Sequence, residues 1–497
     1  MKTLYDLARI NQKNSRIVES MISMDKESPL KKLNLLLSSK KVLDDAEAMN
    51  EIYGKKNVSA FSRLKTRLKD ILIRSTLLQN VNLEASDSRL SEAHNHLRYA
   101  LATKLLIDLR ARNLSVEIAE RAIVKAIKYN LTESIVLLAR VLVTHYGQSE
   151  YNKYKHNKYL LIQEKYLRIY QYELKAENYF MDLQRTQLQS LAAPGDAIRE
   201  KARKYVEELD SIDDIKSYFF ILNRYKVKSA YLEYLKDFEA LLSLSDSILK
   251  EYGAQFNSGM FFQNINLRRA WALIQAGRND EAITSGLKDL ARLPNGTLGW
   301  YFIAHYILKA QLYKGDYKQA IQLITQMIEN PKFQKIGENF KELFYTTLGY
   351  IYLIIESGLI GDPKKYQERL PEFKIYKFLN TTPVFSKDKR GINVSILLMH
   401  VAYLLQKKDY NAIIDRLDSL NQYAYRYLRK DDSFRSNCMI KMVVQMTKAD
   451  FHPIRTERYT RELLEQLKEV KLAGSGENIE TEIIPYEVLW ETMIKSL

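Results

Sequence analysis

Apolar residues recur along most of the chain at the three- and four-residue steps of an amphipathic helix. Between about residues 59 and 78, Leu64, Leu68 and Leu72 form one stripe, and basic and polar side chains occupy the other faces. Glycine and proline, which mark turns and β-hairpins, number only 17 and 9 in 497 residues. The pattern predicts an all-α protein whose helices are joined by short loops.

Four joins between amphipathic segments share one pattern. In each, a short polar turn gives way to a helix that begins with an aromatic or polar residue followed by a small one. The joins are residues 236–242, 277–283, 315–321 and 408–414, and the second and third begin 38 residues apart. Such regular punctuation predicts stacked helical hairpins.

Two further segments, residues 134–147 and 240–253, can be aligned with each other, and both end in Tyr-Gly. Glycine readily takes the left-handed conformation that ends many helices. We therefore expect Gly147 and Gly253 to terminate the second helices of divergent repeats.

The repeated region resembles the tetratricopeptide family, whose repeat is a pair of antiparallel helices of about 34 residues. The first-helix pattern is best matched by Tyr345 to Tyr352, which has the family's aromatic, Leu-Gly and Tyr spacing, and the second-helix pattern by Tyr317 with Ala320. The chain departs from the family in its longer spacing of 38 to 41 residues, and in Leu241 and Ile413, which replace a small residue. The resemblance covers about residues 95–450 and implies a right-handed α-solenoid of stacked antiparallel helix hairpins.

These patterns divide the chain into three parts. Residues 1–90 form an N-terminal helical segment without a clear repeat, and residues 91–472 form the tetratricopeptide-like repeats. Residues 473–497 form a flexible break and a C-terminal amphipathic helix. Between Gly358 and Asn393 lies the longest irregular insertion, which either shapes a binding surface or anchors itself on the repeats.

Composition indicates a soluble protein of a reducing compartment. The single cysteine, Cys438, excludes an internal disulfide framework. The first residues turn polar before an apolar run of signal-peptide length, and no run of about 18 apolar residues is long enough to span a membrane. We expect a cytoplasmic location.

The chain carries 76 Lys and Arg against 60 Asp and Glu, a net charge of +16. One helix concentrates five of these cations and is a candidate polyanion site: Arg63, Lys65, Arg67, Lys69 and Arg74. Either the helix lies along a phosphate backbone, or the long side chains cover its apolar stripe, which is the interpretation that we favour. For the lysines and tyrosines between Tyr146 and Tyr179, we likewise favour helix packing over base stacking.

Sequence patterns of catalysis are missing. The chain contains no HExxH, GxxxxGK[ST], GxGxxG or GxSxG motif, and its seven histidines are dispersed. Cys438 precedes an apolar run and is expected to be a small buried hydrophobe. We expect no enzymatic activity, no cofactor and no metal.

The last 13 residues form a compact amphipathic pattern that begins at Pro485. Its apolar face carries one of the three tryptophans of the chain. This helix either packs back on the last repeat as a cap, which we favour, or docks in the groove of another subunit. The face consists of Tyr486, Leu489, Trp490, Met493, Ile494 and Leu497.

Together these features predict a non-enzymatic protein-binding scaffold or adaptor that recognises a peptide or helix of a partner protein. One alternative is a nucleic-acid-associated regulator that uses the basic N-terminal helix. Another is an enzyme with an unrecognised site. The sequence indicates neither the partner nor the oligomeric state.

Overall fold

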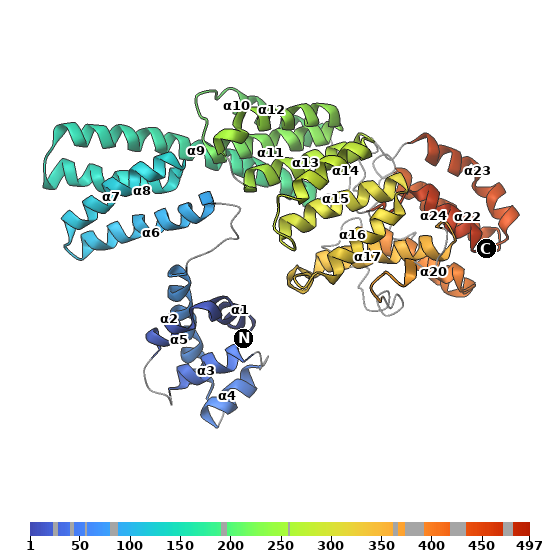
Figure 1. Cartoon of the computed structure of the whole chain (residues 1–497), viewed down its shortest axis with the longest axis horizontal. Helices are drawn as coiled ribbons and strands as arrows, with labels where there is room; N and C mark the ends of the chain where they lie inside the picture. Colours follow the sequence, from blue (N-terminus) through green and yellow to red (C-terminus); the bar gives the residue numbers. More distant parts are fainter. Residues whose placement is uncertain are drawn as a thin grey trace. The chain divides into compact units, whose positions relative to one another are not determined.

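The computed structural model describes the chain except residues 23–27, 40–43, 55–56, 80–87, 190–195, 257–258, 361–365, 373–391, 418–433 and 471–480. The described residues contain helices and no strand, which confirms the predicted all-α class (Figure 1). None of their helices is both long and apolar enough to cross a membrane. Internal contacts divide the chain into two compact units, and the boundary along the sequence falls after Ala122.

The first unit comprises residues Met1–Ala85 and Arg89–Ala122. Helix α5 packs against α1, α2 and α3, and α3 also packs against α4. Their apolar faces form one core around Leu33, Leu68 and Leu72, none of which is exposed. The helices of this unit are α1 (Lys2–Ile10), α2 (Ser15–Met21), α3 (Pro29–Ser38), α4 (Asp45–Tyr53), α5 (Val58–Leu77), α6 (Ser88–Asp108) and the first part of α7 (Arg112–Lys128).

The second unit contains the repeat-like helices. From α11 to α17, each helix packs against the next one along the chain, and α13 also packs against α15. The helices are α8 (Thr132–Thr144), α9 (Lys153–Gln189), α10 (Asp196–Asp210), α11 (Tyr218–Leu235), α12 (Phe238–Phe256), α13 (Gly259–Gln275), α14 (Asn279–Leu290), α15 (Leu298–Lys314), α16 (Tyr317–Glu329), α17 (Glu338–Glu356), α20 (Ile392–Gln406), α22 (Phe434–Lys448), α23 (Pro453–Glu469) and α24 (Tyr486–Lys495).

All four joins expected from the sequence have the same backbone geometry. Lys236, Gly277, Gly315 and Lys408 each take a left-handed conformation, with φ between 57° and 82°. The N–H of each residue donates to the carbonyl three positions before it, and the next N–H donates to the carbonyl five positions before. This is the Schellman motif, which satisfies the last carbonyls of a helix and reverses the chain. The same backbone motif therefore ends the helix at each of the four joins.

Three further helix ends use the same motif. Arg110, Asn130 and Asp450 are also left-handed and make the same pair of backbone hydrogen bonds. None of them is a glycine, and the residues that follow them do not match the pattern of the four joins, so the sequence did not reveal them.

The helix that follows each of the four joins buries the residue that lies five positions after the start of the join. Leu241, Ala282, Ala320 and Ile413 occupy this position, and each is at most 2 % exposed. The position therefore belongs to the core whether its side chain is small or large, which explains how the repeats tolerate Leu241 and Ile413.

The expectation that two Tyr-Gly pairs end helices is wrong. Gly147 lies within a π-helical turn (His145–Ser149), and Gly253 lies inside α12, which continues to Phe256. A Cβ atom would lie 2.9 Å from the His156 ring at Gly147 and 3.2 Å from the Phe262 ring at Gly253. Both glycines therefore permit close side-chain packing and do not reverse the chain.

Candidate functional site

The five cations of the candidate polyanion site lie on α5 but do not form one group. Lys65 forms an ion pair with Asp45 of α4, and its Nζ lies 5.2 Å from the centre of the Phe61 ring. The other four cations are exposed. Arg63, Arg67 and Arg74 share one side of α5, because residues four and eleven positions apart on a helix point in nearly the same direction.

Tyrosines of the lysine-tyrosine segment take part in packing within the chain. Tyr146 and Tyr159 are buried and stack with ring centroids 6.0 Å apart, and Lys155 Nζ donates to the Tyr146 hydroxyl at 2.9 Å. Tyr179 of α9 stacks on Tyr205 of α10 at 3.8 Å. Helix packing therefore accounts for these tyrosines, whereas Tyr151 and Tyr154 of the same segment are exposed.

The C-terminal helix α24 packs on its own chain, against α20, α22 and α23. Of the six apolar residues expected to form its face, Ile494 and Leu497 are half-buried. The other four are at most 3 % exposed: Tyr486, Leu489, Trp490 and Met493. The helix therefore lies within the core of the second unit.

The residues that precede α24 are buried as well, and other helices hold their backbone. Lys309 of α15 is fully buried, and its Nζ donates to the carbonyls of Glu482 at 2.9 Å and Ile483 at 3.2 Å. The Tyr313 hydroxyl donates to the Glu482 carbonyl at 2.7 Å, and Ser395 Oγ of α20 donates to the Thr481 carbonyl at 2.6 Å. We refer to residues 481–497 as the C-terminal segment.

A buried charge cluster fastens the same segment to α22. Arg435 and Glu482 are 1 % and 0 % exposed, and the guanidinium donates to both Glu482 carboxylate oxygens at 2.9 and 2.7 Å. It also donates to Glu487 at 2.7 Å and to the carbonyls of Leu467 and Val470 at 2.8 and 2.6 Å. Burial alone would lower the pKa of Arg435, but the hydrogen bonds and negative charges of the two carboxylates raise it. The arginine therefore stays charged.

No local pattern in the sequence pointed to this cluster. Arg435 lies 47 residues from Glu482 along the chain, and Lys309 lies 173 residues from its acceptor. Only the apolar face of α24 indicated that the C-terminus is packed.

Cys438 and His305, two of the residues considered for catalysis, are buried. Cys438 is 3 % exposed, its Sγ donates to the Leu463 carbonyl at 3.0 Å, and burial raises the pKa of its thiol. Burial and the nearby Lys309 ammonium lower the pKa of His305 to about 3. In the part of the chain that the structure describes, no three His, Cys, Asp or Glu side chains gather as a metal site.

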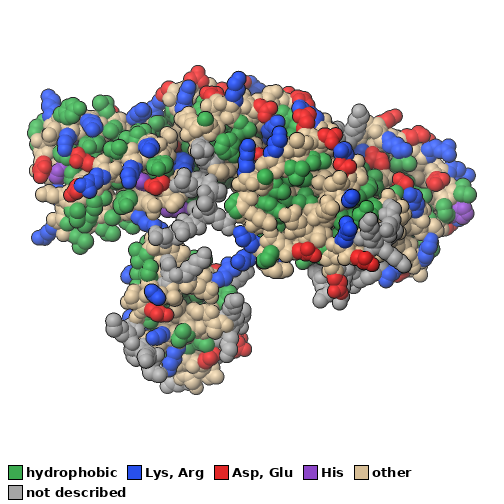
Figure 2. Space-filling model, viewed as in Figure 1, with side chains coloured by type: hydrophobic (Ala, Val, Ile, Leu, Met, Phe, Trp, Pro, Cys, Tyr) green, Lys and Arg blue, Asp and Glu red, His purple; other side chains and the backbone are tan. Residues whose placement is uncertain are grey.

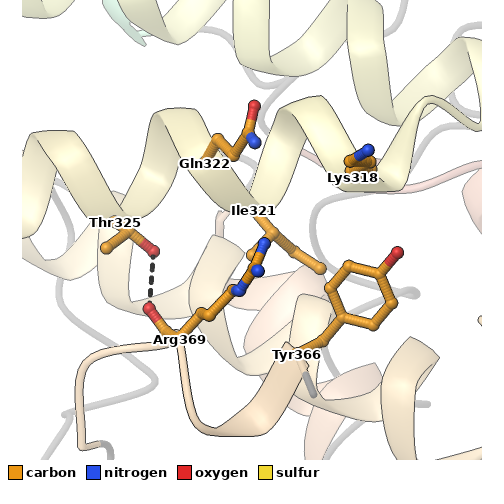
Figure 3. Close-up of a pocket in the computed structure, with 6 residues that line it drawn as sticks. All are labelled: Lys318, Ile321, Gln322, Thr325, Tyr366 and Arg369. Atoms are coloured by element: carbon orange, nitrogen blue, oxygen red, sulfur yellow. Dashed lines mark hydrogen bonds between the residues drawn. The ribbon is translucent and has the colours of Figure 1, made fainter. Parts of the chain in front are cut away.

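An open pocket lies between α16 and the described part of the irregular insertion. Its volume is about 230 Å³. Arg369 points into the space beside Ile321 and Tyr366 (Figure 3), and its carbonyl accepts a hydrogen bond from the Thr325 hydroxyl at 3.3 Å. Lys318 lies at the rim near Tyr366 (Figure 3). The pocket therefore combines two cations with an apolar and aromatic wall.

The cations of this pocket differ from many others in the second unit. Lys318 and Arg369 are exposed and form no ion pair with any residue that the structure describes. Elsewhere, Arg168 pairs with Asp214 and Arg278 with Glu281. Figure 2 shows Lys and Arg interspersed with Asp and Glu over the visible face. We define Lys318, Ile321, Gln322, Thr325, Tyr366 and Arg369 as the α16 pocket.

No protein-family model matches this sequence, and no curated protein or solved structure is similar enough to count as a match.

Proposed function

We propose that this chain is a non-enzymatic scaffold that binds an acidic peptide segment of a partner protein, and that its second unit is a right-handed, tetratricopeptide-like solenoid in the cytoplasm. The repeated Schellman joins and the equivalent buried positions after them support the repeat assignment. The single observation that carries the binding role is the α16 pocket, which is open and holds two cations without a carboxylate partner among the described residues.

The chemistry of the α16 pocket favours an acidic side chain beside an apolar one. The Arg369 guanidinium presents a planar set of N–H donors that matches a carboxylate, and Lys318 adds a second positive charge. Ile321 and Tyr366 supply the apolar contact. A peptide bound here would keep its backbone in solvent and place one acidic side chain between the two cations.

The C-terminal segment supports the idea that these helices suit peptide recognition. Lys309 and Tyr313 bind the backbone carbonyls of Glu482 and Ile483, and the helix that follows fills an apolar site. An amphipathic helix of a partner docks in a groove through the same kind of apolar face. Because the chain's own segment occupies that site, the partner is expected at the α16 pocket.

The test is affinity capture with the tagged full-length protein from extracts of its own cells, treated with nuclease and analysed by mass spectrometry. The variant Lys318→Glu with Arg369→Glu reverses both pocket charges. The control variant, Lys288→Glu with Arg292→Glu, reverses two charges near the end of α14 and outside the pocket. We expect the wild type and the control to capture a stoichiometric partner, and the pocket variant to recover at least about tenfold less of it, since a loss of about 1.4 kcal/mol suffices.

Two results would contradict the proposal. Recovery of no protein after nuclease treatment would argue against a protein-binding scaffold. Equal capture by all three proteins would place the binding surface outside the α16 pocket.

A further inference from the structure

Two consecutive helices of the first unit, α4 and α5, are separated by only four residues, 54–57. Helix α4 ends before Gly54, which is left-handed at φ 64° and donates its N–H to the Asn50 carbonyl at 2.7 Å. Helix α5 begins after Asn57, whose side chain accepts a hydrogen bond from the Ala60 N–H at 3.2 Å. A connection of this length also joins the two helices of a helix-turn-helix, and in DNA-binding examples of that motif the second helix enters the major groove. Here α5 packs mainly on α1, α2 and α3.

The apolar face of α5 is already used. Phe61, Leu68 and Leu72 are at most 2 % exposed in the core of the first unit. The opposite face presents the exposed arginines and small polar residues, among them Ser59, Ser62 and Thr66. The exposed Asp70, Ile73 and Leu77 lie on this face as well. A face of short polar side chains and cations suits contact with base edges and phosphates.

The arginines of α5 point away from the acidic residues of α4. Lys65 forms its ion pair with Asp45, so α4 lies on the Lys65 side of α5. Arg63 lies two positions earlier, about 200° around the helix at 100° per residue. Arg67 and Arg74 point with Arg63 and therefore face away from the carboxylates of α4.

Positive charge is concentrated here, and of the cations on α5 only Lys65 forms an ion pair within the described residues. Residues 55–74 contain seven Lys and Arg against one Asp, a net charge of +6 out of +16 for the chain. Within the described ranges, Arg63, Arg67 and Arg74 take part in no ion pair. Unpaired arginines along one side of a helix are placed to neutralise consecutive phosphates.

We propose that the first unit binds duplex DNA, with α5 in the major groove and Arg63, Arg67 and Arg74 on the phosphate backbone. The inference is independent of the scaffold function proposed for the second unit. Duplex DNA is favoured over double-stranded RNA, whose deep and narrow major groove does not admit a helix. It is favoured over a membrane surface because the apolar face of α5 is buried in the core and is not available to lipid.

Fluorescence anisotropy with the full-length protein and a labelled duplex of mixed sequence tests this proposal. The variant Arg63→Ala with Arg67→Ala and Arg74→Ala removes the three proposed phosphate contacts. The control, Arg16→Ala with Arg140→Ala and Arg461→Ala, removes three exposed arginines from α2, α8 and α23. Circular dichroism verifies that both variants keep the helix content of the wild type.

The expected size of the effect follows from counterion release. Each phosphate contact contributes about 0.9 to the slope of log affinity against log salt, so affinity falls about 3.5-fold per contact between about 50 and 200 mM salt. Without three contacts, the loss of affinity between these two salt concentrations should be about 40-fold smaller in the variant than in the wild type. The control variant should keep the salt dependence of the wild type.

Three outcomes would overturn the proposal. One is the absence of duplex binding at low salt. Another is an equal change of the salt dependence in the α5 variant and in the control variant, which would mean that the overall charge of the chain causes binding. The third is tighter binding to single-stranded RNA or to vesicles of phosphatidylserine and phosphatidylcholine than to the duplex.

Discussion

The substitution Arg435→Met tests how the C-terminal segment is held. It removes three hydrogen bonds to carboxylate oxygens, at 2.7 to 2.9 Å, and two to backbone carbonyls. The Glu482 carboxylate, which is 0 % exposed, loses its countercharge and keeps a hydrogen bond from the Tyr486 N–H at 2.7 Å. The variant therefore leaves a negative charge in the core.

The expected cost is large because one member of a buried pair has been removed. Breaking such a pair typically costs about 3–5 kcal/mol, since the remaining charge pays the desolvation penalty alone. The double variant Arg435→Met with Glu482→Gln removes that charge and should recover more than about 1 kcal/mol, although it alters one more residue. A recovery of stability in the double variant would identify the buried charge as the cause, and a further loss would identify the loss of packing.

Amide hydrogen exchange in α24 measures the effect where it occurs. If the C-terminal segment opens locally, a cost of 3–5 kcal/mol corresponds to exchange that is about two to four orders of magnitude faster at Leu489 to Met493. Amides of α3 in the first unit serve as the internal control.

The reasoning would be refuted if Arg435→Met accelerated exchange in α24 less than about fivefold, which corresponds to less than about 1 kcal/mol. It would also fail if the double variant exchanged faster than the single one. The first result would mean that the apolar face of α24 holds the segment and that the charge cluster is dispensable. The second would mean that the burial of an unpaired charge is not the source of the cost.

Three further predictions concern the second unit. Gly315→Ala should lower stability by about 1 kcal/mol in thermal unfolding, from backbone strain alone, because φ is +82° and nothing lies within 4 Å of the added Cβ; an unchanged midpoint would contradict this. Gly286→Ala should cost about 1–3 kcal/mol in the same assay, since its Cβ would lie 2.6 Å from Ile307 Cγ1, and a smaller loss than at Gly315 would refute the packing argument. Because burial lowers the pKa of His305 to about 3 from 6.5, the unfolded chain binds the proton more readily and stability is lost as pH falls through this range. His305→Leu should therefore make urea unfolding less sensitive to pH between about 6.5 and 4, and an unchanged slope would contradict the assignment.

The helical class and the four joins could be predicted because both depend on local chemistry. The Schellman motif uses six consecutive residues, and glycine at Gly277 and Gly315 marks it directly. Lys236 and Lys408 were found only because the residues after them match the same pattern. At Arg110 no such pattern follows, and a left-handed arginine leaves no mark in composition.

The buried site could not be predicted, for a different physical reason. Its hydrogen bonds join Lys309, Arg435 and Glu482, which are separated by tens to more than a hundred residues. Only the path of the chain brings them together. Each, taken alone, is a charged residue of the kind that usually stays in solvent. The α16 pocket was equally hidden, because Arg369 comes from an insertion whose position relative to α16 has no counterpart in the repeat pattern.

Lys408 belongs both to a join that the sequence predicts and to the packing of the C-terminal segment, which the sequence does not predict. It occupies a left-handed position, at φ 59°, where glycine would avoid a strain of roughly 1–2 kcal/mol. Its Nζ donates to the carbonyls of Ser496 at 2.6 Å and Leu497 at 2.8 Å, so a lysine here offsets the strain by binding the end of α24. Lys309 holds the start of the C-terminal segment in the same way, through Glu482 and Ile483. Lys309 and Lys408, which come from different helices, thus bind backbone carbonyls at the two ends of the C-terminal segment. Arg435 sets the register of the segment, because a shift of one residue would move Glu482 away from its only buried guanidinium partner among the described residues.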